Sequence, residues 1–531
     1  MIRTKDVLGW AVIGPAVVIF LAGCMVGPNY VPPEDDVPGT WEASAGGGKS
    51  GVERSAALEE WWEGFNDSTL NKLIARAGKE NRSLKIAVAR VVEARGARGV
   101  EASALFPAVA GSGAYERSRS SESIGVPVVQ NPQNLFSTGF DAGWEIDVFG
   151  GIRRSIEAAD ATIGGEAEFY RDVMISLYAE VALNYIEIRT LEQRLYLAQQ
   201  NVVIQQESVE ITRNRFDAGL APEIDPSQAE SNLYSTEAVI PQLEDQLTAA
   251  RNRLAVLLGG YPGVVDEYLG KYTGVPMKEV PIPSPPQNFG YGLPADLLRA
   301  RPDIRQAERT LAAQTALIGV AVAELYPRFS LFGNFGFVSI EASDWFDSPS
   351  RSWGFGPSFS WEIFTAGRVR NFIKQRDAQT EQALYGYENT VLEAVAEVET
   401  AMVSIVKEKQ RFLKLQAAEA STEKTVSLIT SNYTAGLVDF QNVLDAQRTL
   451  FTDQDAAASS EGTVAANYVT LFKALGGGAP AETAFPELED KVRTMEERNK
   501  RGLFGRKKSE KNVTQAAPTA VSEGAAAGAG E

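Results

Sequence analysis

The chain repeats itself, and this duplication restricts its fold more than any other feature of the sequence. The stretch WEIDVFGGIR at residues 144–153 has a near-twin, WEIFTAGRVR, at residues 361–370. The same offset of 217 residues, without a gap, aligns further pairs over more than 100 residues: Glu180-Val181 with Glu397-Val398, Phe216 with Tyr433, Ala218-Gly219-Leu220 with Ala435-Gly436-Leu437, and Gly259-Gly260 with Gly476-Gly477. A constant offset of this length indicates two copies of one structural unit.

Composition and charge argue against several classes of function. Hydrophobic residues make up 44% of the 531 residues, which is typical of a chain that lies mostly in water. The formal net charge of −18 would repel nucleic-acid phosphates and favours cations instead. The chain has no histidine, which is the usual general base and zinc ligand. Its sequence also contains no P-loop, G-x-S-x-G motif or Cys/His metal set. We therefore expect no cofactor, metal site or nucleic-acid partner. We also expect no enzyme, although a hydrolase could still use paired carboxylates.

The N-terminus is typical of a cleaved targeting segment. Two basic residues precede a mainly apolar run at residues 7–20, which is too short to span a bilayer comfortably. LAGC follows at residues 21–24, and Cys24 is the only cysteine of the chain. A buried core thiol without a role is the alternative for Cys24, but its place directly at the break favours a processing site. Residues 24–67 contain proline- and glycine-rich stretches and are expected to form a tether.

Two helical stretches, at residues 68–105 and about 295–326, each run into a proline. Pro107 stands in LFP and Pro327 in the matching LYP. A proline lacks the backbone donor and pushes the preceding residue toward extended geometry. Each of the two prolines is therefore expected to mark a change from helix to strand.

Alternation with a period of two follows each proline and predicts four strands in two hairpins. Residues 353–363 place large apolar side chains at odd positions and small or polar ones at even positions. Residues 136–148 show the same pattern with the even positions mostly apolar, residues 328–340 show it more loosely, and residues 109–119 only weakly. Each hairpin is expected to end at an aligned glycine, Gly150 or Gly367.

The two strand faces leave two interpretations open. In a soluble sandwich the aromatic face would pack on a second sheet. In a membrane barrel it would face lipid, and the small residues would line a water-filled lumen. Aromatic residues cluster at both strand ends, which favours the membrane. Because four strands cannot close a barrel and open sheet edges are not tolerated in lipid, we expect the barrel to be shared between chains.

Beyond each glycine the sequence changes to a period of seven, which predicts long coiled-coil helices. The apolar series are Met174, Val181, Ile188, Leu195, Val202, Val209 and Phe216 in the first copy, and Val391, Val398, Ile405, Phe412, Glu419, Val426 and Tyr433 in the second, with one break at Glu419. From Gly150 to about residue 215, such a helix is on the order of 95 Å long at about 1.5 Å per residue. A plain coiled-coil rod would explain the heptads but not the aromatic strands. Each long helix is expected to turn at a short loop that contains Gly219 or Gly436, both candidate helix C-caps.

In these motifs the chain resembles the TolC-like outer-membrane efflux channels, in particular their lipoprotein (NodT/OprM-type) branch. The resemblance is carried by LAGC followed by VGPNYVPP, by the repeated W-E-I strand exit, by the sequences F-D-A-G-L and Y-T-A-G-L, and by NVLDAQ at residues 442–447. It implies an α+β membrane protein: a homotrimer with a twelve-stranded β-barrel, four strands per chain, continued by a long α-helical coiled-coil barrel. Pro107, Gly150, Pro327 and Gly367 would then be the transitions from barrel to tunnel.

The resemblance also implies residue roles and partners. LAGC is similar to a lipobox, so Cys24 would carry lipid and anchor the chain in the outer membrane of a Gram-negative bacterium. Gly219, Leu220, Gly436 and Leu437 would contact a periplasmic adaptor that joins an inner-membrane pump. Asp445 would contribute to a periplasmic ring of three carboxylates, beside Asn442, where the family often has a second aspartate, and Gln441. The aligned residue in the first copy is Gln228.

The implied domains and the remaining alternatives complete the prediction. The boundaries are a signal peptide at 1–23, a lipid-anchored tether at 24–67, the first repeat at 68–260, a Pro-rich linker or equatorial segment at 261–294, the second repeat at 295–477, and a C-terminal equatorial segment with a disordered tail at 478–531. The implied function is passive export of drugs or other small molecules. Type I protein secretion through the same architecture, a lipid-anchored periplasmic scaffold without a pore, and a carboxylate-dependent cell-wall hydrolase are the alternatives.

Overall fold

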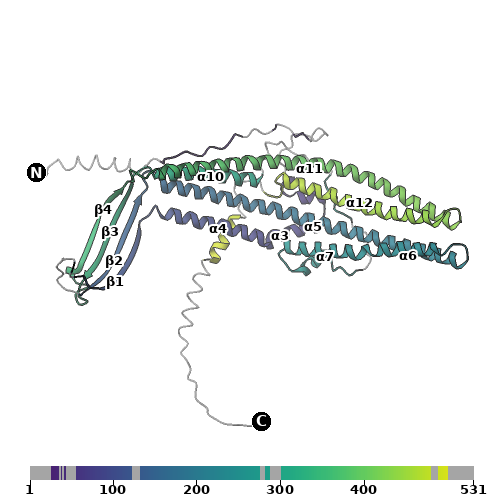
Figure 1. Ribbon diagram of the computed structural model, residues 1–531, viewed down its shortest axis with the longest axis horizontal. Helices are drawn as coiled ribbons and strands as arrows, with labels where there is room; N and C mark the ends of the chain where they lie inside the picture. Colours follow the sequence, from purple (N-terminus) through teal and green to yellow (C-terminus); the bar gives the residue numbers. More distant parts are fainter. Residues whose placement is uncertain are drawn as a thin grey trace, which may run out of the picture.

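The computed structural model describes residues 25–34, 38, 41–42, 56–121, 123, 132–274, 281–286, 301–479 and 488–499. These residues form an elongated molecule with a β-sheet at one end and helical turns at the other (Figure 1). The helices are α2 (Ala56–Glu59), α3 (Ser68–Glu80), α4 (Arg82–Ser103), α5 (Gly151–Asp217), α6 (Ile224–Glu237), α7 (Val239–Leu257), α8 (Asp266–Leu269), α10 (Pro302–Ala323), α11 (Arg368–Thr434) and α12 (Phe440–Ala474). Short 3-10 helices lie at Trp61–Phe65, Pro262–Val265 and Ser348–Ser350, and residues 488–499 form a further helix.

The four strands form one antiparallel sheet in the order β1-β2-β3-β4, which confirms the two predicted hairpins. Its strands are β1 (Ala108–Ser118), β2 (Gln133–Ile146), β3 (Arg328–Ser339) and β4 (Arg351–Ser360). β2 pairs with β3, so the hairpins of the two copies lie side by side. The aromatic face is open to the surroundings: Trp353, Phe355 and Phe359 are 69%, 79% and 71% exposed. In the part of the chain that the structure describes, no second sheet covers this face, so a soluble sandwich is excluded there.

The predicted transitions lie at the ends of these strands. β1 begins directly after Pro107 and β3 directly after Pro327. Gly150 and Gly367 precede α5 and α11 with φ of 79° and 88°, a left-handed conformation that glycine adopts without strain. The chain therefore changes from strand to helix at the same point of each copy.

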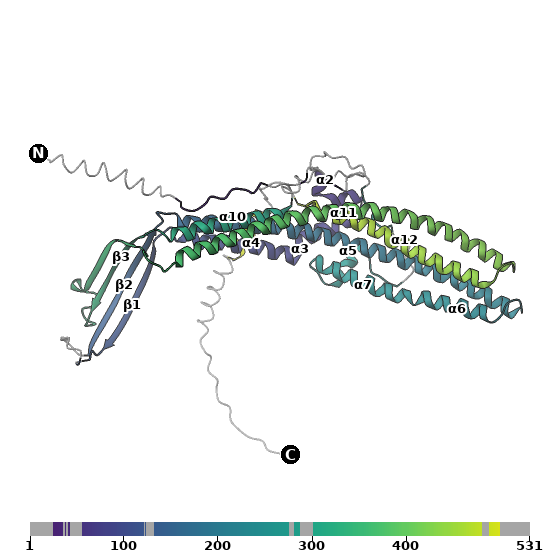
Figure 2. The same cartoon turned by 45° about the horizontal axis from the view of Figure 1, so that its top comes forward.

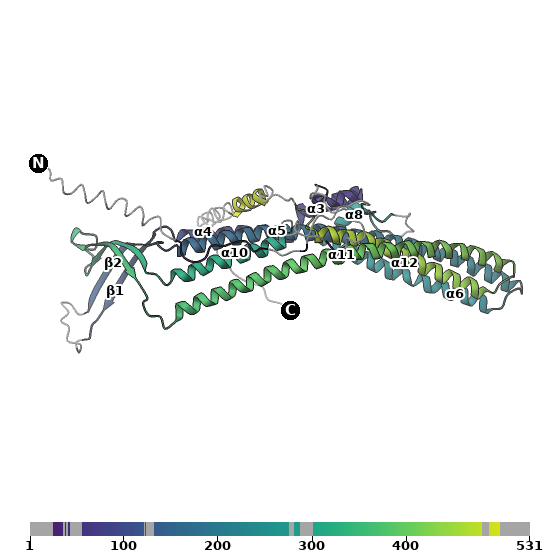
Figure 3. The ribbon, with the colours of Figure 1, turned by 90° about the horizontal axis from the view of Figure 1, so that it is seen from above.

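The long helices reproduce the duplication seen in the sequence. α5 and α11 each contain 67 residues, and their first and last residues are both 217 positions apart. Figure 1 shows both helices running from the sheet end to the far end of the molecule, where α6 and α12 turn back. α4 and α10 accompany the half of the helical body nearest the sheet (Figure 2). α11 packs against α10 and α12, as the view from above also shows (Figure 3).

Two predicted helices differ from the structure. The stretch 68–105 is broken at Asn81, whose extended backbone ends α3 and whose side chain accepts from the Leu84 N–H to start α4. The returning helix of the first copy is divided into α6 and α7 at Ala238, whereas α12 is continuous. Pro241 explains this second break, because proline has no N–H to donate and its ring clashes with the carbonyl one turn earlier. The aligned residue in the continuous helix α12 is Ala458. The first residues of the predicted stretch 295–326 lie outside the described residues.

The main apolar core lies midway along the body, where elements of both copies meet. Leu70 and Leu73 of α3, Tyr185 of α5 and Phe472 of α12 are buried there. The Trp61 ring stacks on Phe472 with centroids 5.2 Å apart, which joins the N-terminal region to the last long helix. Within the described ranges, no helix is both long and apolar enough to span a membrane.

Candidate functional site

Both tips at the far end of the molecule close with the same hydrogen-bonded turn. The N–H groups of Gly219 and Leu220 donate to carbonyls in the last turn of α5, both at 2.8 Å. Those of Gly436 and Leu437 do the same at the end of α11, both at 2.9 Å. These bonds are the pattern of a glycine C-cap. The closure presents Leu220 and Leu437 outward, and they are 68% and 73% exposed.

The two tips are tied to each other through Arg215, Tyr433 and Asp225, for which the sequence patterns indicated no contact between the tips. Arg215 Nη1 donates to the Thr434 carbonyl at 2.9 Å, and its guanidinium lies 4.9 Å from the centre of the Tyr433 ring. The Tyr433 hydroxyl donates to Asp225 Oδ2 at 3.0 Å. Burial and this hydrogen bond raise the pKa of Tyr433 to about 12, so it stays a neutral donor. These contacts therefore join the tips of the two copies.

The candidate ring residue Asp445 is exposed on α12, close to the tips. Gln441 Nε2 donates to Asp445 Oδ1 at 3.0 Å, so these two predicted residues lie together. Asn442 instead donates to the Asp439 carbonyl at 3.3 Å. Asp445 is the sixth residue of α12 and lies beyond the first turn, where the helix dipole acts most strongly. The alternative interpretation, that Asp445 serves only to offset the helix dipole, is therefore less favoured. The aligned Gln228 is half-buried on α6.

A polar seam joins α5 of the first copy to the second copy. Its four α5 residues recur every seven positions, and each bonds across to α12 or to the end of α11. The bonds are Arg194 Nε to Asp455 Oδ1 at 2.7 Å, Asn201 Nδ2 to Gln454 Oε1 at 2.7 Å, Gln447 Nε2 to Ser208 Oγ at 2.7 Å, and the Arg215 bond described above. Buried polar groups require such partners, so the seam fixes the register between the copies. The sequence contains a signal for this seam: a polar series with a seven-residue period, in which each residue immediately precedes a member of the apolar heptad series.

The repeated WEI motif closes each strand exit with an equivalent bond. Trp144 Nε1 donates to the Leu105 carbonyl at 2.9 Å, and Trp361 Nε1 donates to the Leu325 carbonyl at 3.1 Å. Each leucine belongs to the LFP or LYP sequence that leads into the hairpin. The tryptophan at the end of each hairpin is thereby tied to the chain that enters it, which explains why both copies keep the motif.

A buried arginine holds the N-terminal segment against the start of α5. Arg154 is 1% exposed, and its Nε donates to the Val26 carbonyl at 3.0 Å. Its Nη2 donates to Asn29 Oδ1 at 2.8 Å and to the Gly27 carbonyl at 3.3 Å, while Nη1 pairs with Glu157 at 2.7 Å. Sequence reasoning missed this clamp, because it joins residues more than 100 positions apart.

Close packing fixes the same segment at the strand-to-helix transition. A Cβ on Gly27 would come within 2.4 Å of the Gly319 Cα, so the two backbones touch. Met25 packs on Gly150, where a Cβ would lie 2.8 Å from the Met25 Cα. The predicted lipidation residue, Cys24, lies outside the described residues, but its neighbour is held at the junction of sheet and helices.

Carboxylates occur along the helices without forming a metal centre in the described ranges. Glu419, which breaks the heptad series of α11, is half-buried. Burial raises the pKa of Glu419, and the nearby carboxylates Glu423 and Asp453 raise it further. No group of three or more Asp, Glu, His or Cys side chains among the described residues is placed to hold a metal ion.

Known proteins share this sequence and fold over most of the chain. The sequence profile of the outer membrane efflux protein family matches residues 73–260 and 293–477. Nodulation protein T of Rhizobium leguminosarum bv. viciae is 32% identical over 466 residues, which cover 87% of this chain and 92% of the relative. The solvent efflux pump outer membrane protein SrpC of Pseudomonas putida is 30% identical over 465 residues, which cover 87% of this chain and 97% of the relative.

Solved structures agree with this comparison. The outer-membrane channel OprN is 34% identical with a TM-score of 0.76, and the match covers 86% of this chain and all of that one. The open MtrE outer membrane channel of Neisseria gonorrhoeae is 27% identical with a TM-score of 0.72, covering 87% of this chain and 100% of that one.

These relatives confirm the predicted fold class, a trimeric β-barrel continued by a long helical barrel. The family profile of outer membrane efflux proteins and the solved outer-membrane channels also confirm the prediction that the chain is not an enzyme. Each of the two stretches that match the family profile contains one β-hairpin, one 67-residue helix and the helix or helices that run back from its tip. The chain belongs to the outer membrane efflux protein family.

Proposed function

We propose that the chain is the outer-membrane exit duct of a tripartite efflux system and passes small molecules outward without chemistry. The proposal rests on one observation: the two ends of the elongated molecule expose different kinds of apolar surface. An exposed aromatic sheet lies at one end, and two exposed leucines, Leu220 and Leu437, lie at the other. One end suits lipid and the other suits an apolar contact with an adaptor protein.

Export of small molecules is preferred over protein secretion. Relatives named for solvent, toluene and antibiotic efflux support this choice. The test is dye accumulation in cells that lack their own channel of this type. Cells that contain this chain with its adaptor and pump should accumulate less dye than cells without the chain. Equal accumulation in the two strains would contradict the proposal.

We assign Asp445 to a ring of three carboxylates at the periplasmic end of the trimer. Two unit charges ~4 Å apart interact by about 1 kcal/mol even in bulk water, so three carboxylates together hold a divalent cation well. Asp445→Ala should raise conductance and weaken block by divalent cations about tenfold or more, without changing trimer yield. The measurement is single-channel current during a magnesium titration.

Two further variants separate charge from packing at Asp445. Asp445→Asn keeps the size of the side chain that contacts Gln441 and should behave like Asp445→Ala. Asp445→Glu keeps the charge and should retain most of the block. If magnesium blocks Asp445→Ala and wild type at the same concentration, the carboxylate ring is not part of the duct.

We also assign lipid attachment to Cys24, as the LAGC sequence indicates, and location to the outer membrane, which relatives named as outer membrane proteins support. Cys24→Ala should eliminate incorporation of labelled fatty acid and change sorting, while the exposed aromatic sheet still favours membrane insertion. Mass spectrometry of the mature N-terminus checks this assignment. An unmodified Cys24 thiol in mature wild-type protein would show it to be wrong.

A further inference from the structure

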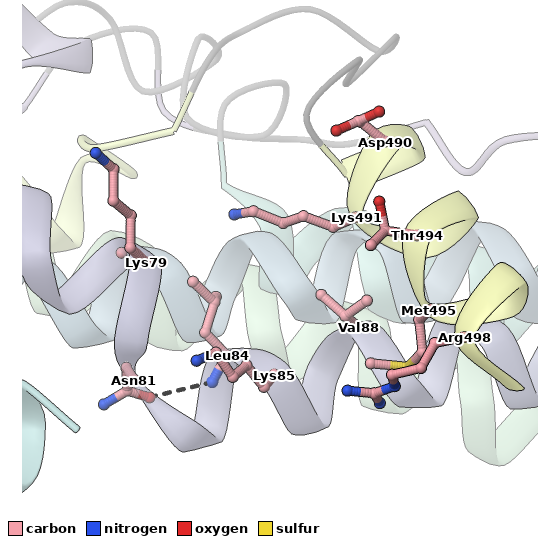
Figure 4. A pocket seen from close by; sticks show the side chains of 11 residues that line it. Lys79, Asn81, Leu84, Lys85, Val88, Asp490, Lys491, Thr494, Met495 and Arg498 are labelled. Atoms are coloured by element: carbon pink, nitrogen blue, oxygen red, sulfur yellow. Dashed lines mark hydrogen bonds between the residues drawn. The ribbon is translucent and has the colours of Figure 1, made fainter. Parts of the chain in front are cut away.

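A pocket lies between the α3–α4 joint and the helix at 488–499 (Figure 4). These elements lie away from both the tips and the sheet (Figure 1). Its volume is about 240 Å³. The apolar part is formed by Leu84 and Val88 of α4 and by Met495 of the facing helix. Because the two walls come from opposite ends of the chain, a ligand there would hold the C-terminal helix against the first repeat.

The wall formed by residues 488–499 is held in place independently of any ligand. Leu488 and Val492 are buried in the main core. Lys491 Nζ donates to the hydroxyl of the buried Tyr170 at 2.7 Å. Glu489 pairs with Arg95 of α4. The pocket therefore has two fixed sides.

The pocket is cationic in a protein with a net charge of −18. Lys79, Lys85, Lys491 and Arg498 line it, against the single carboxylate of Asp490. Asp490 is already paired with Arg493, and Lys85 with Glu80. Among the described residues, neither Lys79 nor Arg498 has an ion-pair partner. The C-terminus of α3 and the N-terminus of α4 meet at Asn81, so their helix dipoles offset each other here and the basic side chains supply the positive charge.

We propose that this pocket binds a small amphipathic anion, a carboxylate on a short apolar chain. The apolar chain would pack on Leu84, Val88 and Met495, and the carboxylate would accept from Lys79, toward which the Lys491 side chain extends (Figure 4). Ligand sites typically combine an apolar lining with a few convergent polar groups in this way. The site lies away from the tips and from the sheet and does not depend on the efflux function, so either proposal can fail alone.

The test is a calorimetric titration of octanoate into the full-length protein in phosphatidylcholine nanodiscs, with empty nanodiscs as the blank. Saturable binding of one octanoate per chain is expected. Neutral octanamide should bind at least tenfold more weakly, because it keeps the chain and loses the charge. Absence of saturable octanoate binding, or equal binding of octanamide, would overturn the proposal.

Variants locate the binding in this pocket. Lys79→Glu should weaken octanoate binding at least tenfold. Thr494→Trp, which fills the pocket from an exposed position, should do the same. Lys72→Glu is the matched control, because Lys72 is exposed on α3 and does not line this pocket. The circular dichroism spectrum and the melting temperature of each preparation verify its fold. Wild-type affinity in both pocket variants would place octanoate elsewhere and refute the site.

Discussion

Replacing Leu220 and Leu437 together with aspartate is expected to abolish export while trimers remain intact. Both side chains are more than two-thirds exposed, so the folded chain loses little packing. Burial of one leucine at an interface contributes about 1.5–3 kcal/mol, and each chain presents two. Aspartate would also place an unpaired charge in that contact. Adaptor affinity should therefore fall by at least about 100-fold, since about 1.4 kcal/mol corresponds to a factor of ten.

The measurement combines dye export in cells with adaptor binding by the purified trimer. The control replaces both leucines with methionine, which keeps the apolar surface and should retain export. Native mass of the aspartate variant shows whether trimers persist. Undiminished export in that variant would remove the tips from the adaptor interface.

Arg154→Ala should release the N-terminal segment from the helical body. The substitution leaves the Val26 and Gly27 carbonyls without their donor and opens a space beside α5. Removal of one partner from a buried charged network costs about 3–5 kcal/mol. Local opening of the segment should then increase by about two orders of magnitude or more, which cleavage by chymotrypsin after Tyr30 reports.

Arg370→Ala is the matched control for this experiment. Arg370 also lies in the first turn of a long helix, but it is exposed. Cleavage after Tyr30 should stay at the wild-type rate in this control. Equal cleavage rates in Arg154→Ala and wild type would show that the arginine does not hold the segment.

Local periodicity made most of the fold predictable. The period of two gave four strands, the period of seven gave the two 67-residue helices, and Pro107, Gly150, Pro327 and Gly367 marked the changes between them. Each of these signals depends only on residues that are close together in the sequence, so it can be recognised in a single sequence. The aromatic face could be assigned for the same reason, because alternation alone fixes which residues share it.

Features that depend on contacts between distant segments were not predicted. The clamp around Arg154 joins residues that the sequence separates widely, and no local pattern links a buried arginine to particular carbonyls. The bond between Arg215 and Thr434 joins the two copies across 219 positions. The break at Asn81 depends on its side chain, which also donates to the Leu257 carbonyl at 2.9 Å. Tertiary partners decide such features.

The candidate site was predicted in part. The exposed tip leucines could be located because a glycine C-cap has a local signature. The neighbourhood of Gln441 and Asp445 follows from their spacing on one helix face. The proposed role of Asp445 in gating depends on the arrangement of three chains, and that of the tip leucines depends on an adaptor protein. One sequence specifies neither.

The most direct test of the central claim, that three copies of this chain form one continuous duct, is conductance in planar lipid bilayers. Purified trimers should insert and give discrete, voltage-driven current steps of uniform size, with cations preferred over anions because of the net charge of −18. A protein that needs no detergent, stays monomeric and gives no current would contradict the duct and favour a lipid-anchored periplasmic scaffold.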